Sequence, residues 1–371
     1  MNTRRYRLGE LCRMVKGTSP TLKTPPGQYP LVVTASFRRT SDTWQLEGPA
    51  VCIPLISSTG HGDAALHRIH YQDGKFALAN LLVALLPKDS SVCDAQYLYH
   101  FLMTHKDELL VPLMQGTANV SLKEQDIAQV EINLPSLEEQ TLAVTQIEQI
   151  TAQVHQVEEL REQEQIEIMQ MLTSSFWQIT QNAPRHPLKD VAPIMRRPVD
   201  VKAASLYPEI GIRSFGNGTF HKPVLTGLEV GSKRIFMIEP GDLLFSNVFA
   251  WEGAIAVARP EDTARFGSHR FISCIPDSAK AIANFLCFFF LTDEGLALIG
   301  KASPGGAGRN RTLGISTLEK ILVPVPDLAD QRWFCSLLAK ATGLRRLHNE
   351  TKMELDALLP SVLARAFAGE L

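Results

Sequence analysis

The sequence lacks several features that mark other classes of protein. Its 371 residues contain six cysteines and no Cys-x-x-Cys pair: Cys12, Cys52, Cys93, Cys274, Cys287 and Cys335. This scatter argues against a zinc ribbon or a disulfide framework and favours a reducing compartment. The first residues lack the apolar core of a signal peptide, and the most apolar stretch, Ile282–Leu291, is too short to span a bilayer. We therefore expect a cytoplasmic protein with no membrane segment and a buried helix at Ile282–Leu291.

A strong excess of positive charge is also missing. The chain has 37 lysines and arginines against 39 aspartates and glutamates, and its net charge is −2. Its length is enough for two or three domains, and its 45% of hydrophobic residues is ordinary for a folded protein. A nucleic-acid-binding role would therefore need a local basic face or basic partner subunits.

No catalytic set of residues is found. Gly295–Ala302 is one residue short of a phosphate-binding loop, because alanine stands where Ser or Thr should hold magnesium. Asn133–Ser136 lacks the second proline and the aromatic residue of an amino-methyltransferase signature, and no Gly-rich loop for S-adenosylmethionine is present. Asp277 and Lys280 lack the Glu-x-Lys pair of a nuclease. The sequence thus predicts a non-catalytic chain without a cofactor of its own.

One histidine cluster raises the question of a metal. His61, Asp63, His67 and His70 lie within ten residues and could supply ligands for zinc or iron. Their spacing matches no established metal motif. We therefore favour a solvated or DNA-facing loop and predict no metal site.

The most informative positive feature is an internal repeat. Residues 119–140 match residues 310–331 without a gap, at a constant offset of 191 positions. The same offset continues to the last residue, and an offset of 188 relates the apolar stretch at 97–104 to that at 284–292. The matched pairs include Asn119 with Asn310, Leu122 with Leu313, Pro135 with Pro326, Gln140 with Gln331, Leu172 with Leu363 and Phe176 with Phe367. The chain is therefore two copies of one unit, roughly 1–182 and 183–371.

Each copy begins with a mixed part that contains short apolar strands. The sequence predicts such strands at Pro30–Thr34, Val51–Ile56, Leu81–Leu86, Asp242–Ser246 and Phe271–Ile275. A proline and an acidic, helix-opening run then start a long helix, which we expect at Gln140–Gln178 and Gln331–Phe367. Each helix has about 40 residues and is about 60 Å long, too long to fit inside a small domain.

The long helices carry an apolar seam with a polar break. Ala143, Ile147, Ile150 and Val154 alternate by three and four residues, which is typical of a coiled coil. Polar residues interrupt the seam at Arg161 and Glu164 in the first helix and near His348 in the second. The matching seams predict an antiparallel pair; the alternative is that each helix packs only on its own domain.

The predicted fold class is α+β, with two mixed α/β domains joined by two long antiparallel helices that form a coiled coil in an internal pseudo-twofold repeat. The expected boundaries are 1–136 for the first domain, 137–182 for the first helix, 183–327 for the second domain and 328–371 for the second helix.

This order of domain, helix, domain and helix resembles the specificity subunit of type I restriction–modification systems, the HsdS family. The motifs that carry the resemblance are the junctions Leu134–Gln140 and Val325–Gln331 and the closing stretch Leu358–Leu371. The resemblance covers the whole chain, although the first helix ends in Phe-Trp-Gln-Ile-Thr where the second ends in Ala-Phe-Ala-Gly-Glu-Leu. The first copy is therefore the degenerate one.

The resemblance implies that each domain is a target-recognition domain for one half of a bipartite DNA target, while the helices set the spacing. It implies double-stranded DNA as a partner, two modification subunits with S-adenosylmethionine, and restriction subunits with ATP and magnesium. Two alternatives stay open: a two-headed protein-binding scaffold, and a subunit of a methylation-only defence system.

Candidate DNA contacts are polar or basic side chains on the two domains, because arginine and lysine bind guanine or phosphate and asparagine binds adenine. They are Lys16, Arg38, Arg39, Arg68, Asn119, Arg196, Arg197, Arg213, Lys233, Arg234, Arg270, Lys301, Arg309, Asn310 and Arg311. The apolar helix ends are candidates for docking modification subunits. Those residues are Ile168, Leu172, Phe176, Leu355, Leu363 and Phe367.

Overall fold

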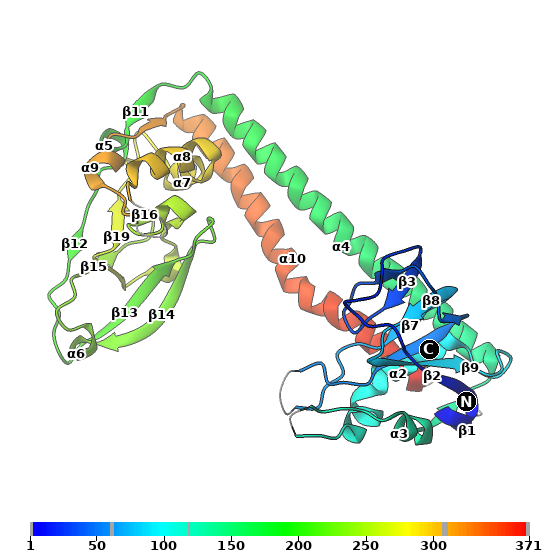
Figure 1. The fold of residues 1–371 in the computed structure, drawn as a ribbon. Helices are drawn as coiled ribbons and strands as arrows, with labels where there is room; N and C mark the ends of the chain where they lie inside the picture. The colour runs from blue at the N-terminus through cyan, green and yellow to red at the C-terminus, as the bar shows by residue number, and fades with distance from the viewer. Residues whose placement is uncertain (1–2, 60–62, 118, 306–310, 369–371) are drawn as a thin grey trace. The chain divides into compact units, whose positions relative to one another are not determined.

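The computed structural model describes residues 3–59, 63–117, 119–305 and 311–368. These residues form two compact units: unit 1 comprises Met1–Arg161 and Asn349–Leu371, and unit 2 comprises Glu162–His348. Each long helix is divided between the units (Figure 1). We refer to residues 3–134 of unit 1 as head 1 and to residues 185–325 of unit 2 as head 2.

Head 1 is built on two sheets, of which one is antiparallel and one is mixed. One sheet is antiparallel and orders its strands as β2 (Cys12–Lys16), β9 (Leu82–Pro87), β6 (Ala50–Pro54) and β7 (His70–Gln72). The other sheet contains one parallel pair, β3 with β8, and orders its strands as β4 (Arg39–Ser41), β3 (Tyr29–Val32), β8 (Lys75–Leu78) and β5 (Leu46–Glu47). Alternate residues of β9 pack into two different hydrophobic clusters. Val83 and Leu85 belong to one cluster, and Leu82 and Ala84 belong to the other. Both faces of β9 are therefore covered, which explains its continuous apolar run.

Short helices and a terminal strand pair complete head 1. They are β1 (Arg4–Arg7), which pairs with β10 (Glu131–Leu134), and α1 (Leu8–Leu11), α2 (Ala95–Leu109), η1 (Val111–Leu113) and α3 (Glu124–Gln129). Asp94 caps the N-terminus of helix α2, because its carboxylate accepts a hydrogen bond of 2.8 Å from the backbone N of Tyr97. It buries Tyr97, Leu98 and Leu102 against the sheet.

Head 2 has the corresponding sheets. The larger orders its strands as β12 (Arg197–Pro198), β15 (Ile235–Ile238), β18 (Arg265–Ser268), β13 (Leu206–Ile212) and β14 (Thr219–Thr226). The smaller orders them as β17 (Ile255–Val257), β16 (Leu243–Ser246) and β19 (Phe271–Cys274), and β11 (Arg185–Pro187) pairs with β20 (Leu322–Pro324). The helices are α5 (Leu188–Val191), α6 (Gly227–Val230), η2 (Ala250–Glu252), η3 (Pro260–Asp262), α7 (Ala283–Leu291), α8 (Asp293–Ala302) and α9 (Ile315–Leu318).

The two heads share one topology. The hairpin β3–β4 corresponds to β13–β14, and the parallel partner β8 corresponds to β18. In the second sheet, β6 between β7 and β9 corresponds to β16 between β17 and β19. The internal repeat predicted from the sequence is therefore confirmed in three dimensions.

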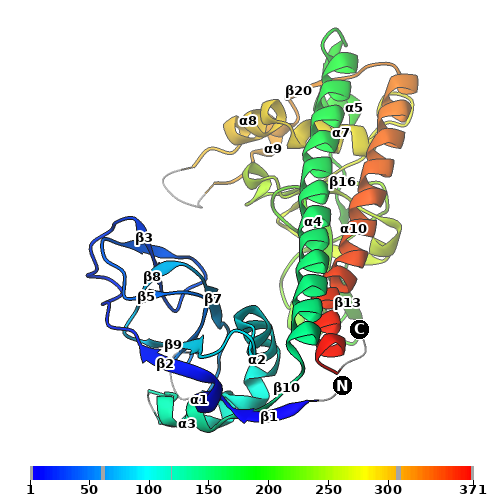
Figure 2. The same ribbon diagram turned by 90° about the vertical axis from the view of Figure 1, so that its right-hand side faces the viewer.

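The long helices are α4 (Leu137–Thr180) and α10 (Leu328–Ala368), and they run side by side in opposite directions (Figures 1 and 2). In unit 1, Arg161 Nη2 donates to Thr351 Oγ1 at 2.9 Å. In unit 2, His348 Nε2 lies 3.3 Å from Glu164 Oε2. The residue numbers of the partners therefore decrease along α10 as they increase along α4, which confirms that the two helices are antiparallel. Glu164 and His348, which interrupt the two seams, are thus partners of each other.

The far end of each long helix lies in the core of the other copy's head. In unit 2, the Phe176 ring from α4 lies 5.0 Å from that of Phe285 and 5.2 Å from that of Phe334, between ring centroids. In unit 1, the Phe367 ring from α10 lies 5.4 Å from that of Tyr97 and 5.5 Å from that of Phe101. Phe176 and Phe367 are equivalent in the repeat, so the exchange of helix ends is reciprocal.

Among the described residues, no single helix is long and apolar enough to cross a membrane. In the described part of the chain, α7 and α8 taken together meet such a criterion, and they are bent by 82° with respect to each other. Helix α7 buries Phe285, Leu286, Phe289 and Phe290 in the core of head 2. The buried helix predicted at Ile282–Leu291 is therefore confirmed.

Candidate nucleic-acid interface

A buried glutamine ties each long helix to its own head. Gln140 and Gln331 are both 0% exposed. Gln140 accepts a hydrogen bond from Asp94 N at 2.9 Å and donates to Val92 O and Pro135 O, both at 2.9 Å. Gln331 makes the same three bonds: it accepts from the N of Ile282 at 3.0 Å and donates to the carbonyl oxygens of Lys280 at 2.9 Å and Pro326 at 2.8 Å. This network explains why glutamine recurs at the junction.

Head 2 carries a polar loop between Gly305 and Arg311. Lys301 is exposed near the end of α8, and Gly305 forms an isolated bridge with Arg311. The base of the loop is closed by Leu313 N, which donates to Asn247 O at 2.8 Å. The Arg311 guanidinium lies 4.8 Å above the centre of the Trp251 ring. Arg309 and Asn310, predicted to contact DNA, lie outside the described residues.

Head 1 has the same loop frame. Gln115 and Ser121 exchange two backbone hydrogen bonds of 2.8 Å, and Leu122 N donates to Leu55 O at 2.9 Å. The Leu122 bond is the equivalent of the Leu313 bond in head 2. Asn119 is exposed within this loop. Each head therefore carries a polar loop closed at its base by a strand-like bridge.

Two of the predicted DNA-contacting arginines make several contacts within the fold. Arg38 donates to Gln72 Oε1 at 3.0 Å and to Tyr71 O at 3.0 Å, and its Nη1 lies 3.2 Å from His70 Nδ1. Arg197 donates to both carboxylate oxygens of buried Asp242, at 2.6 and 3.1 Å. These hydrogen bonds raise the pKa of Arg197 above its ordinary value. Arg38 and Arg197 therefore hold loops and strands together.

Other candidates also have contacts within their heads. Arg39 donates to Thr21 O at 2.8 Å, and Arg196 lies 5.3 Å above the Phe236 ring. Arg213 donates to Thr219 O at 3.1 Å and lies 5.0 Å above the Phe220 ring. The remaining described basic candidates are exposed: Lys16, Arg68, Lys233, Arg234, Arg270 and Lys301.

The fold gathers only some of the head 2 candidates. Arg213 lies at the tip of the β13–β14 hairpin, and Arg270 O accepts from Asn247 N at 2.7 Å beside the Arg311 loop. Lys233 and Arg234 follow α6, at the opposite end of that hairpin (Figure 1). The seven residues of β13 span about 20 Å, so Lys233 and Arg234 lie in a different region of head 2 from Arg213.

The predicted docking residues are not an exposed patch. Leu172 and Phe176 are 2% and 6% exposed and belong to the core of head 2. Phe367 packs in the aromatic cluster of head 1, and Ile168, Leu355 and Leu363 are half-buried. The expectation of surplus exposed apolar surface is therefore wrong, because each head uses the helix end of the other copy to complete its core. Docking of modification subunits at these residues stays a prediction.

The histidine cluster does not form a metal site within the described part of the chain, where no group of three or more His, Cys, Asp or Glu could hold an ion. His61 lies outside that part, and His67 is exposed. His70 is buried on β7, contrary to the expected solvated loop, and burial lowers its pKa to about 4, aided by the charges of Arg38 and Arg68.

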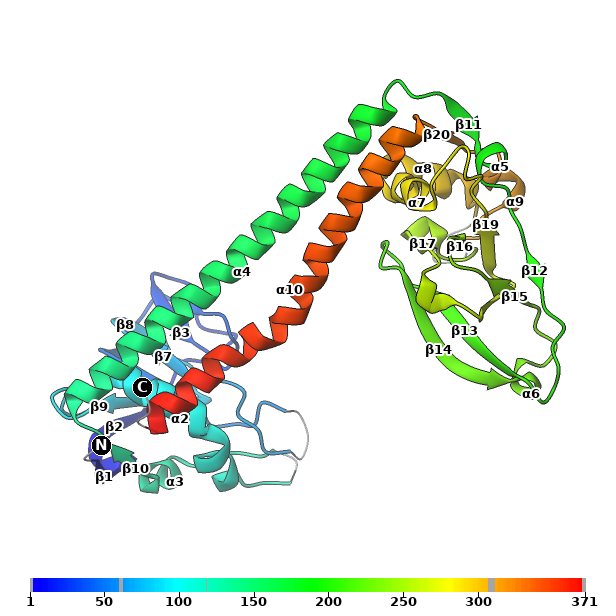
Figure 3. The same cartoon turned by 180° about the vertical axis from the view of Figure 1, so that it is seen from behind.

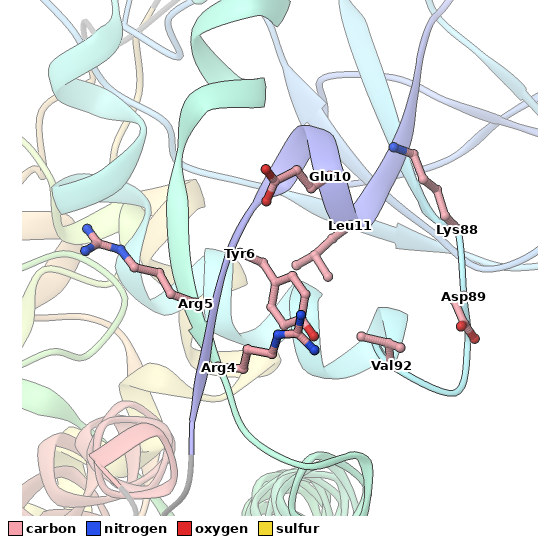
Figure 4. Close-up of a pocket in the computed structure, with 8 residues that line it drawn as sticks. All are labelled: Arg4, Arg5, Tyr6, Glu10, Leu11, Lys88, Asp89 and Val92. Carbon is pink, nitrogen blue, oxygen red and sulfur yellow. The ribbon is translucent and has the colours of Figure 1, made fainter.

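A pocket of about 460 Å³ lies beside the terminal strand pair of head 1 (Figure 4). Its polar rim carries both signs of charge, from Arg4, Lys88, Glu10 and Asp89. Lys88 Nζ donates to Gly9 O at 2.8 Å, and Arg4 lies 5.1 Å above the Tyr6 ring. Because its charges are mixed and partly satisfied within head 1, the pocket has no clear preference for an anion.

Comparison with known proteins agrees with this architecture. A family model, described as the type I restriction modification DNA specificity domain, matches residues 2–168. No curated protein matches the chain. The HsdS subunit from Thermoanaerobacter tengcongensis has a similar structure, with a TM-score of 0.59 and 18% identity over 100% of this chain and 97% of that one.

Two further solved structures are similar. One comes from work on complex assembly and conformational transition of the type I R-M system, with a TM-score of 0.65 and 17% identity over 100% of this chain and 98% of that one. The other is the type I restriction-modification S subunit from M. genitalium, with a TM-score of 0.53 and 14% identity over 99% and 96% of the chains. HsdS specificity subunits are generally non-catalytic. Residues 2–168 therefore match a type I restriction modification DNA specificity domain, and the chain has the fold of HsdS subunits along its whole length.

Proposed function

We propose that each head reads one half of a bipartite duplex DNA target. The observation that carries this proposal is the repeated loop frame, Gln115–Ser121 in head 1 and Gly305–Arg311 in head 2. Both frames sit on heads of one topology, and residues 2–168 match a DNA specificity domain. The loops differ in sequence inside a common frame, which is what two readers of different half-sites require.

The side chains on these loops suit base and phosphate contacts. Asn119 can form paired hydrogen bonds with adenine, and Arg311 with guanine or with a phosphate. Exposed lysines and arginines on the same heads would add sequence-independent attraction to the DNA backbone. This attraction has to be local, because the whole chain has a net charge of −2.

Catalysis would be supplied by partner subunits. We propose two modification subunits that bring S-adenosylmethionine and methylate adenine, and restriction subunits that bring ATP and magnesium. A methylation-only system would lack the restriction subunits and leave the role of this chain unchanged. The protein-binding scaffold is not favoured, because a DNA specificity domain matches the first head.

Mapping methylated adenines in the native genome tests the proposal. We expect methylation at a two-part sequence with a fixed gap, and its loss when the gene for this chain is deleted. Restoring the chain should restore the same sequence. Methylation that persists without the chain would contradict the proposal.

An Arg311→Ala variant separates base reading from phosphate binding. A lost base contact should weaken binding of the assembled complex by about 1–3 kcal/mol and relax preference in one half-site only. A lost phosphate contact should weaken binding evenly across sequences and make the salt dependence shallower. Unchanged binding on cognate and scrambled duplexes would mean that Arg311 serves only to stack on Trp251.

A further inference from the structure

An exposed phenylalanine stands at the tip of the β13–β14 hairpin in head 2. Phe215 is 80% exposed, and its backbone φ is +61°. A bulky side chain rarely adopts this left-handed conformation, and such residues persist only where the surrounding structure holds them. The hairpin and its tip can be followed in Figure 3. Both the apolar exposure and the backbone conformation therefore need an explanation.

The tip is firmly anchored to the neighbouring turn. Phe215 N donates to Glu252 O at 2.8 Å, and Gly216 N donates to Gly253 O at 2.9 Å. Gly253 has a φ of +75°, and a Cβ there would come within 3.3 Å of the Phe215 backbone. The contact between the two turns therefore favours glycine on one side, and the backbone that carries the phenylalanine ring is held in a fixed place.

The hairpin is also anchored behind its tip, at the start of its second strand. At the start of β14, Thr219 Oγ1 donates to a carboxylate oxygen of Asp262 at 2.7 Å, and His221 Nε2 lies 2.9 Å from the other oxygen. Asp262 is 0% exposed and closes η3. The hairpin is thus held at its tip by η2 and Gly253 and behind the tip by η3, so the backbone that presents the exposed ring is preorganised.

Head 1 presents a phenylalanine in the same place. Phe37 is 61% exposed and follows β3 as Phe215 follows β13. An offset of 178 positions relates the two stretches, YPLVVTASF at 29–37 and YPEIGIRSF at 207–215. In head 1 the next residue, Arg38, ties the loop to β7 through Tyr71 O and Gln72. Two equivalent hairpins therefore expose one phenylalanine each.

In head 2 the segment that anchors Phe215 also contacts the polar loop described above. The segment η2, which anchors the tip, carries Trp251, and Arg311 lies over the Trp251 ring. Phenylalanine has no group that could bind a phosphate, so on a DNA-facing surface the partner of its ring is a base. Stacking on a base tolerates any sequence, because every base has a π-face.

We propose that Phe215 and Phe37 stack on bases, one ring in each half of the DNA target. This inference rests on the proposed DNA-reading function and adds to it a contact that the basic residues cannot make. The rings would insert at or stack on a base step, while the polar loops select base identity. Preorganisation of the loop reduces the ordering cost of placing the ring against the DNA.

The test uses the full chain with the subunits that co-purify with it. The probe is the duplex that the wild-type complex selects from a pool of randomised duplexes. Phe215→Ala should bind this duplex about 5- to 150-fold more weakly. The salt dependence of binding should keep its slope, because no phosphate contact is lost. Phe37→Ala should act likewise, and Phe215→Trp, which keeps a ring, should retain binding.

A matched control is Leu228→Ala. Leu228 is 78% exposed on α6, at the other end of the same hairpin, and its replacement should leave DNA binding unchanged. Phe215→Leu discriminates stacking from general apolar contact, and it should bind as weakly as Phe215→Ala. Thermal melting of each variant checks that the head remains folded.

The outcomes are distinct. Wild-type affinity of folded Phe215→Ala, or full binding by Phe215→Leu, would overturn the stacking proposal while leaving DNA reading intact. Loss of co-purifying subunits with unchanged DNA affinity would show that the ring is a protein contact, which also overturns it. Failure of the wild-type complex to select any sequence would overturn the proposed function itself.

Discussion

Single buried polar residues hold this architecture together. Gln140 and Gln331 each satisfy one backbone N–H and two backbone carbonyl groups at the point where a long helix leaves its head. The repeat identified both glutamines in the sequence, and their role follows from their hydrogen bonds. An apolar residue of similar size would leave these backbone groups without partners in a buried site.

Gln331→Leu should therefore destabilise unit 2 by about 2–4 kcal/mol, because it leaves one buried and two part-buried backbone groups without this partner. Urea denaturation measures the loss, and hydrogen exchange should show it at the amide of Ile282, which loses its acceptor. Gln140→Leu should do the same in unit 1. As a control, Gln163→Ala on the exposed face of α4 should change stability by less than about 0.5 kcal/mol. Equal stability of Gln331→Leu and wild type would contradict this role.

A buried histidine should make unit 1 sensitive to acid. Burial lowers the pKa of His70 to about 4 from an ordinary value of 6.5. The unfolded chain therefore binds this proton at a higher pH than the folded chain, so stability is full above about pH 6.5 and falls as the pH drops toward 4. His70→Gln should flatten that part of the profile.

The matched control for this prediction is His155→Gln, since His155 is exposed on α4. Denaturation midpoints measured from pH 7.5 to 4 give the comparison. If His70→Gln keeps the wild-type dependence on pH, His70 is not the residue responsible.

The roles of individual basic residues could not be predicted from the sequence. Arg197 and Arg311 were both candidates for DNA contact, yet Arg197 pairs with Asp242, which is 45 positions away. Only the fold brings that carboxylate to the guanidinium. Phe37 and Phe215 were missed, although the repeated Tyr-Pro and Ser-Phe pairs at an offset of 178 were a signal that could have found them.

At the level of helices and strands, apolar patterns were good guides. The strand predicted at Val51–Ile56 occurs at Ala50–Pro54, and that predicted at Phe271–Ile275 occurs at Phe271–Cys274. The first long helix begins at Leu137 and ends at Thr180, close to the predicted Gln140–Gln178. The β13–β14 hairpin was not predicted, because the stretch TFHKPVLT has neither an apolar run nor a regular alternation.

Helix length should set the gap between the two DNA half-sites if the proposed function holds. Removing residues 155–168 from α4 and 345–358 from α10 deletes two heptads from each helix and about 21 Å of length. The gap in the preferred target should then shorten by about six base pairs, because base pairs rise 3.4 Å each. Selection from randomised duplexes measures the gap.

The control for this experiment deletes residues 155–168 from α4 alone. That change takes the partners of α4 and α10 out of register and should abolish selection of a two-part target. An unchanged gap in the doubly shortened variant would mean that the helices do not set the spacing.

Across the whole molecule, the main feature that the sequence did not reveal is the exchange of helix ends. The apolar ending of α10 was visible, but it was attributed to partner docking. The structure uses Phe367 to complete the aromatic cluster of head 1 and Phe176 to complete that of head 2. A repeat shows which residues are equivalent, whereas it cannot show which head each of them enters.

This exchange has a consequence for synthesis on the ribosome. Head 1 is made first, but its aromatic cluster includes Phe367, 270 positions after Tyr97. Unit 2 is continuous from Glu162 to His348 and can complete its core before residues 349–371 of unit 1 have been made. The aromatic cluster of head 1 therefore stays incomplete until Phe367 has been made. Stopping the chain after His348 should leave unit 2 protected from proteolysis and unit 1 cleaved at its α2 surface, and equal protection of both units would contradict this order of folding.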